Sequence, residues 1–126
     1  MKHTIQNEFL TVSAAEKGAE LLDTLIHMDE GAAFLGEVAL VPYSSPINES
    51  GLLFYNTLFD ENAACHLALG RGFTNVIKGY ENYTEAELHE MGINDSFMHE
   101  DFMIGTKDMS ITAICEDGKE IAIFEN

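Results

Sequence analysis

A single carboxylate, Glu37, interrupts an otherwise apolar run of nine residues, Ala33–Val41. The length and composition of this run are typical of a strand that is covered on both faces. An ionised carboxylate left alone inside such a strand would cost several kcal/mol. We therefore expect Glu37 either to face water along one side of the strand, or to be paired, protonated or bound to a cation.

Short apolar segments with helical spacing or helical composition occur at three other places. Ser13 and Glu16 have the spacing of a capping box, and the leucines that follow form one apolar stripe, which predicts a helix over Ala14–His27. The alanine- and leucine-rich run Ala63–Leu69 predicts a short buried helix. A second capping box predicts a brief helix that begins after Thr84.

The remaining apolar runs are strand-like, and Pro42–Gly51 between two of them is expected to be a loop. An Asp-Gly pair between the last two runs predicts a β-hairpin. The elements together predict an α+β fold: a single domain over residues 1–126 with a mixed or antiparallel sheet, a few short helices and a C-terminal hairpin. The expected strands are Ala33–Val41, Leu52–Phe59, Phe97–Ile104, Met109–Cys115 and Glu120–Phe124.

The charge balance excludes several classes of partner. The 126 residues include six Lys and Arg against 22 Asp and Glu, a formal net charge of −16. A protein that follows a nucleic-acid backbone needs clustered basic residues, and here the basic residues are scattered. An anionic membrane surface is excluded on the same ground, and no apolar run approaches the ~18 residues that a membrane-spanning helix needs.

Both cysteines, Cys65 and Cys115, lie in apolar stretches, where free thiols behave as small hydrophobic groups. Free thiols, together with an N-terminal sequence unlike a secretory signal, predict a cytoplasmic protein. Cys65 directly precedes His66. Because adjacent helical residues point about 100° apart, the two side chains are not expected to form a nucleophile–base pair.

Histidines in apolar surroundings are the other candidates for chemistry. His66 lies among alanines and leucines, where a satisfied core histidine and a metal ligand are both open interpretations. His99 and Asp101 are two apart in an expected strand, so both side chains point to the same side and could bind one ion. The other three histidines have polar neighbours and are expected at the surface: His3, His27 and His89.

Glu37, His66, His99 and Asp101 together make a nitrogen and oxygen donor set suited to zinc or a related divalent ion. No short zinc motif, phosphate-binding glycine loop or nucleophile elbow accompanies them. A soluble acidic domain in which the four side chains never meet therefore remains an alternative at this stage.

Three segments carry a resemblance to a known family: Asp29–Pro42, Gly51–Gly70 and Asn94–Gly105. In this order they are similar to the C-terminal, metal-binding part of the thermophilic metalloprotease family, which contains the aminopeptidase T, aminopeptidase S and PepS type enzymes. The likeness extends from about Phe9 to the end of the chain.

The resemblance implies a metal-dependent aminopeptidase that removes N-terminal residues from peptides, with a peptide bearing a free N-terminus as substrate. It also implies a homodimer and a centre of two divalent ions (zinc, cobalt or magnesium). Matched motif by motif, the metal ligands are Glu37, His66, His99 and Asp101, the same four residues that the apolar surroundings singled out.

Two departures from the family pattern bear on activity. A site tyrosine of the family corresponds to Phe73, which keeps the ring and lacks the hydroxyl group. Family enzymes are also several times longer and have a further glutamate ligand upstream of this sequence. We therefore expect a truncated aminopeptidase with reduced or no activity, and the alternative is a non-catalytic, dimerising, metal-binding remnant.

Overall fold

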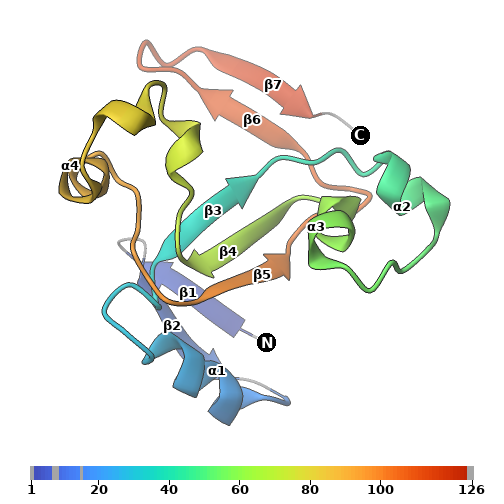
Figure 1. Cartoon of the computed structure of the whole chain (residues 1–126). Helices are drawn as coiled ribbons and strands as arrows, with labels where there is room; N and C mark the ends of the chain where they lie inside the picture. Colours follow the sequence, from blue (N-terminus) through green and yellow to red (C-terminus); the bar gives the residue numbers. More distant parts are fainter. Residues whose placement is uncertain (1, 7–8, 15, 125–126) are drawn as a thin grey trace. The chain divides into compact units, whose positions relative to one another are not determined.

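The computed structural model describes residues 2–6, 9–14 and 16–124 (Figure 1), and among the first fifteen residues it describes the side chain of Leu10 alone. The helical elements are α1 (Ala19–Ile26), α2 (Pro46–Ser50), α3 (Thr57–Asp60), η1 (Glu61–Ala63), η2 (Thr74–Val76), η3 (Tyr80–Asn82) and α4 (Glu85–Glu90). The strands are β1 (Lys2–Gln6), β2 (Phe9–Ala14), β3 (Leu35–Ala39), β4 (His66–Gly70), β5 (His99–Met103), β6 (Ile111–Ile114) and β7 (Glu120–Phe124).

The strands form two hairpins and one three-stranded sheet. β1 pairs with β2 and β6 pairs with β7, both antiparallel, and the third sheet has the order β3-β4-β5. Figure 1 shows β4 running opposite to both of its neighbours. The α+β class, the short helices and the C-terminal hairpin around Asp117-Gly118 are confirmed.

The chain divides into two compact units, each built from two stretches of sequence. The first unit comprises residues 1–38 and 67–102, and the second comprises residues 39–66 and 103–126. The expectation of a single domain remains a prediction. Among the described residues, no helix has both the length and the apolar character that a membrane crossing requires.

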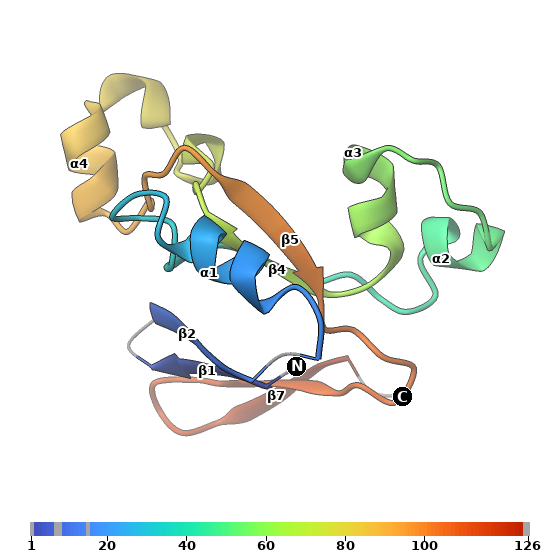
Figure 2. The ribbon, with the colours of Figure 1, turned by 90° about the horizontal axis from the view of Figure 1, so that it is seen from below.

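The first unit has its hydrophobic core under α1. Ile26 of α1 packs with Leu69 of β4 and with Met98, which directly precedes β5. Figure 2 shows α1 lying along β4 and β5. Burial of each such side chain stabilises the fold by about 1.5–3 kcal/mol. The core is completed by Leu10, Ala32 and Ala33, with Leu22, Leu25, Leu35 and Phe102 partly buried against it.

The carboxylate of Asp29 joins the turn after α1 to the segment that leads into β5. Its Oδ1 accepts a hydrogen bond from the Gly31 N–H at 2.9 Å, and its Oδ2 accepts from the Phe97 N–H at 2.8 Å and from the Ser96 hydroxyl at 3.0 Å. The Phe97 hydrogen bond is the main cause of a lowered pKa for Asp29, and partial desolvation opposes it. The ionised form is therefore the one that holds the turn.

In the second unit, polar side chains hold an apolar loop at the surface. Asn56 caps α3 by accepting from the Leu58 N–H, and the Asp60 carboxylate accepts from the N–H groups of Phe54 and Asn56. Tyr55 between them has a positive φ of 56°. We call residues 52–59 the 52–59 segment; its exposed large apolar side chains are Leu52, Leu53, Phe54, Tyr55, Leu58 and Phe59.

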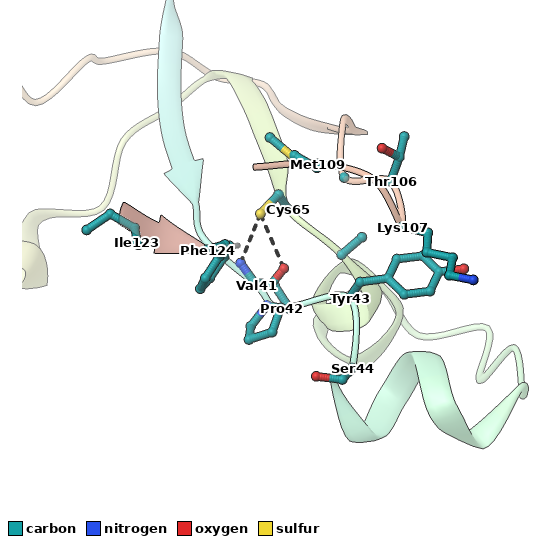
Figure 3. Close-up of a pocket in the computed structure, with 12 residues that line it drawn as sticks. Val41, Pro42, Tyr43, Ser44, Cys65, Thr106, Lys107, Met109, Ile123 and Phe124 are labelled. Carbon is teal, nitrogen blue, oxygen red and sulfur yellow. Dashed lines mark hydrogen bonds between the residues drawn. The ribbon is translucent and has the colours of Figure 1, made fainter. Parts of the chain in front are cut away.

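Cys65 lies beside a cavity of about 430 Å³ in the second unit (Figure 3). Its thiol donates to the Val41 carbonyl at 3.2 Å and accepts from the Val41 N–H at 3.3 Å. Both cysteines are free thiols, as expected. Cys65 is thus a buried group whose sulfur is engaged by the backbone of Val41.

The predicted start of the first helix is wrong. Ala14 pairs with Lys2 at the end of β2, and α1 begins only at Ala19, after Gly18, which has a positive φ of 75° and provides no side-chain cap. The Ser13 capping box is overridden because pairing with β1 holds this part of the chain extended. The predicted end at His27 is one residue beyond the last helical residue.

The predicted types of two later segments are wrong. The expected strand Leu52–Phe59 is a loop followed by α3, because Asn56 and Asp60 satisfy its backbone N–H groups locally. The expected helix Ala63–Leu69 is β4, the central strand of its sheet. Short apolar runs do not distinguish a buried strand from a buried helix. The expected loop Pro42–Gly51 contains the short helix α2.

The expected strand Ala33–Val41 shortens to β3, and the capping box at Thr84 is confirmed at the start of α4. The expectation that both faces of β3 are buried is wrong at Val38, which is 64% exposed. The expected strand Phe97–Ile104 corresponds to β5, and the last two strands correspond to β6 and β7.

We expect Asp29→Asn to lower the urea midpoint of unfolding at neutral pH, because a neutral amide is a weaker acceptor for the Gly31 and Phe97 N–H groups. The pKa of Asp29 is lower in the folded than in the unfolded chain. The contribution of Asp29 to the free energy of unfolding is therefore complete above its pKa in the unfolded chain, about 4. This contribution is lost as the pH falls through the pKa of Asp29 in the folded chain. The difference between variant and wild type should close in this acidic range.

Asp95→Asn is the matched control, because Asp95 lies in the same connecting segment with an exposed side chain. Its midpoint should follow that of the wild type at every pH. A difference for Asp29→Asn that stays constant down to acidic pH would contradict the role given to the ionised carboxylate.

Candidate metal centre

Glu37 is the central residue of β3, and its side chain is 25% exposed. The neighbouring Val38 points to the other face of the strand, which is open to solvent. Glu37 is therefore not a fully solvated surface glutamate. Its half-buried position leaves paired, protonated or cation-bound states as the chemical options that the sequence indicated.

β5 places His99 and Asp101 on one side of the strand, as their spacing predicts. The Nε2 atom of His99 lies 3.4 Å from Oδ1 of Asp101 and 3.6 Å from Oε2 of Glu37. The side chains of His99 and Asp101 are 24% and 12% exposed. One imidazole nitrogen therefore lies against two carboxylates from two different strands.

Backbone and ring contacts set the orientation of His99. Its Nδ1 lies 2.7 Å from the carbonyl oxygen of Arg71. Because a carbonyl can only accept, Nδ1 carries the proton, and in the neutral ring Nε2 has the lone pair. The ring of Phe73 packs on the imidazole with centroids 4.9 Å apart. The nitrogen that faces Glu37 and Asp101 is thus the one available to a cation.

His66 is the first residue of β4 and is 1% exposed. Its Nδ1 lies 3.0 Å from the Ala64 carbonyl, so this ring is also held with Nδ1 protonated. Glu37, His66 and Asp101, on the strands of one sheet, each have a donor atom, and these atoms lie within 4.8 Å of one another. Residues far apart in the sequence therefore supply a compact donor set.

The donor set fits a divalent cation. Oδ1 of Asp101 is buried and has no hydrogen-bond partner among the described residues. When His99 is protonated at Nδ1 alone, the lone pair of its Nε2 faces the same place, where a cation would be stabilised. Imidazole nitrogen with carboxylate oxygen is the ligand combination of zinc and other first-row ions.

The three histidines that the sequence placed at the surface are not part of this donor set as described. His27 and His89 are exposed, as expected, and the side chain of His3 lies outside the described residues. Sequence reasoning missed the Arg71 carbonyl that holds His99. No sequence signal could have found it, since every residue has a backbone carbonyl.

Comparison with known proteins assigns the family. The family model described as thermophilic metalloprotease (M29) matches residues 4–126. The chain belongs to this family. The resemblance inferred from the three sequence segments is therefore confirmed.

Curated relatives of this M29 chain are named as aminopeptidases. Aminopeptidase AmpS of Bacillus subtilis (strain 168) is 51% identical over 123 residues, which cover 98% of this chain and 30% of the relative. Aminopeptidase PepS of Streptococcus thermophilus is 43% identical over 126 residues, 100% of this chain and 30% of the relative. The chain thus spans about a third of the length of these relatives.

A solved structure has the same fold. The structure described as wild-type AmpT from Thermus thermophilus superposes with a TM-score of 0.81 at 41% identity, over 98% of this chain and 30% of that one. The fold described above is therefore that of the corresponding part of an M29 protein.

We expect Asp101→Asn to raise the stability of the metal-free protein by about 1 kcal/mol, because it removes a buried charge that lacks a hydrogen-bond partner. The measurement is urea unfolding in the presence of a chelator at mildly alkaline pH. Glu100→Gln, at an exposed neighbouring position of β5, should change the stability by less than about 0.5 kcal/mol. A strongly destabilised Asp101→Asn would contradict this account of the cluster.

Proposed function

We propose that this chain carries the metal-binding part of a metal-dependent aminopeptidase, with Glu37, His66, His99 and Asp101 as metal ligands. The observation that supports the proposal most is the convergence of donor atoms of Glu37, His66 and Asp101 within 4.8 Å of one another. His99 adds an imidazole nitrogen 3.4 Å from Asp101 and 3.6 Å from Glu37. The substrate would be a peptide with a free N-terminus. The names of the curated relatives support this reaction class.

In this proposal the four residues bind a divalent ion, and the backbone around them orients the histidine rings. Glu37 and Asp101 supply the negative charge that a divalent ion requires, and the two histidines present Nε2 because backbone carbonyls hold their Nδ1 protons. A bound ion of this kind polarises a scissile carbonyl and lowers the pKa of a water ligand. We propose zinc, cobalt or magnesium, with two ions in the complete family site.

Phe73 supports reduced rather than full activity. On the resemblance to the family it stands where a site tyrosine is expected, and its ring packs on His99. A hydroxyl at this place could bind an ion or a reacting group, and the phenyl ring can do neither. A non-catalytic metal-binding protein is therefore the second candidate, and the same observation favours it.

Composition and the free thiols support the remaining proposals. A net charge of −16 disfavours a nucleic-acid or anionic membrane partner, because both would repel this surface. Free thiols at Cys65 and Cys115 support a reducing, cytoplasmic location.

The 52–59 segment supports a homodimer. Its large apolar side chains are exposed, while Asp60 and Asn56 hold its backbone in one conformation. An ordered apolar patch of this kind is typical of an interaction surface. We propose that two copies pair through it, since one self-complementary patch is sufficient for a two-fold dimer.

The test of the proposed function measures metal content and activity separately. After dialysis against zinc or cobalt we expect bound metal in the wild type, and weak or no release of leucine from a chromogenic leucine amide. Glu37→Gln should lower metal affinity by at least about 10-fold, because even the loss of a residue that only supports a ligand costs that much at metal sites.

Glu100→Gln is the control for Glu37→Gln, since it neutralises an exposed carboxylate near the same cluster. Bound metal without turnover would reject the enzyme and retain the second candidate. A wild type that binds no metal would reject both.

For the dimer, Leu58→Glu should shift sedimentation velocity from dimer toward monomer. A carboxylate in an apolar interface costs several kcal/mol, and added salt should strengthen the wild-type dimer by screening its acidic surface. Leu21→Glu, at another exposed leucine, should leave the association unchanged. A wild type that is monomeric at every salt concentration would contradict this proposal.

A further inference from the structure

The segment at the end of β4, residues 70–73, contacts His99 at more than one place. The Arg71 carbonyl accepts the His99 Nδ1 proton at 2.7 Å, and the Arg71 N–H donates to the Met98 carbonyl, also at 2.7 Å. The Phe73 ring covers the imidazole. The position of this short segment therefore determines which His99 nitrogen is protonated and where Nε2 points.

A single side chain, Asn94, fixes the same segment from its other side. The Asn94 Nδ2 group donates to the Gly70 carbonyl at 2.6 Å and to the Gly31 carbonyl at 2.8 Å. The Asn94 carbonyl in turn accepts from the Gly72 N–H at 2.8 Å. Asn94 is half-buried, so few waters can replace these bonds.

The packing around this segment leaves it little freedom to find another position. A Cβ at Gly36 would overlap the carbonyl oxygens of Gly70 and Arg71, and one at Gly70 would overlap the Met98 carbonyl. Gly70 also has a φ of 87°, which other residues rarely adopt. The Arg71 carbonyl is thus confined between β3 and His99.

We propose that Asn94 is a positioning residue for the metal centre: through Gly70 and the Arg71 carbonyl, it holds His99 in the tautomer that presents Nε2 to a cation. This role rests on the proposed function of His99 as a ligand. The hydrogen bonds described for Asn94 are all to backbone groups, those of Gly31, Gly70 and Gly72.

The test is Asn94→Asp, which keeps the shape and removes the donor. A carboxylate facing the Gly31 and Gly70 carbonyls is repelled by both, so the segment that carries Arg71 should shift. Asn82→Asp is the matched control, because Asn82 also donates to a carbonyl, that of Gly79 at 3.1 Å, but at an exposed place.

The first readout is the ring tautomer, from long-range proton–nitrogen correlations of the imidazoles in the metal-free protein. We expect His99 to be protonated at Nδ1 in the wild type and in Asn82→Asp, and to become a mixture of tautomers in Asn94→Asp. His66 is an internal reference, since its Nδ1 partner is the Ala64 carbonyl, and its tautomer should not change.

The second readout is zinc affinity by competition with a chromogenic chelator. We expect Asn94→Asp to bind zinc about 10-fold more weakly than wild type, the usual effect of losing support for a ligand, and Asn82→Asp to bind as the wild type does. A wild type that binds no zinc but shows the tautomer change in Asn94→Asp would overturn the proposed function and support the positioning role.

The proposal is overturned if His99 keeps the same tautomer in Asn94→Asp, whatever the zinc affinity, or if wild-type His99 is protonated at Nε2. Should Asn94→Asp fail to fold, Gly72→Ala is the second variant. Its Cβ would lie 3.3 Å from both the backbone nitrogen of Asn94 and the carbonyl oxygen of Gly36, which strains residues 70–73 mildly. A smaller tautomer change in the same direction supports the proposal, and no change overturns it.

Discussion

Close backbone packing around Gly70 is the constraint on which the candidate site depends. The chain there leaves β4 through a conformation that favours glycine, and carbonyl groups occupy the space that side chains at Gly36 and Gly70 would need. Because neither glycine has a side chain, the backbones of β3 and of the residue before β5 both pack directly against residues 70 and 71. Glu37, one residue from Gly36, and His99, one residue from Met98, therefore occupy defined positions relative to each other.

The site illustrates a conflict between stability and binding. Glu37 and Asp101 both lie beside the Nε2 atom of His99, and Asp101 has an oxygen without a hydrogen-bond partner among the described residues. A buried carboxylate oxygen without a partner weakens the metal-free fold, and an ion bound there would offset that penalty. The cluster is better explained by what it can bind than by what it adds to the fold.

The sequence singled out side chains that the structure brings together, Glu37, His66 and Asp101, although it placed one of them on the wrong element. Their role as metal ligands stays a prediction. Glu37 and Asp101 were recognisable because charge is costly in apolar segments, and that argument holds whether the segment is a helix or a strand. His66 was expected on a helix and lies on β4, because alanine and leucine suit either element when both faces are buried. The loop before α3 was missed because Asn56 and Asp60 satisfy backbone groups that a neighbouring strand would otherwise satisfy. The Arg71 carbonyl had no signal at all.

The two histidines differ in how far along the chain their backbone partners lie. His66 is held by a carbonyl two residues before it, so its ring is oriented as soon as that turn forms. His99 is held by a carbonyl 28 residues before it, which requires closure of the whole intervening segment. The orientation of one ligand therefore depends on its own neighbours in the chain, and that of the other depends on packing between distant segments. An ion that needs both histidines would be retained by closed molecules and released by partly opened ones.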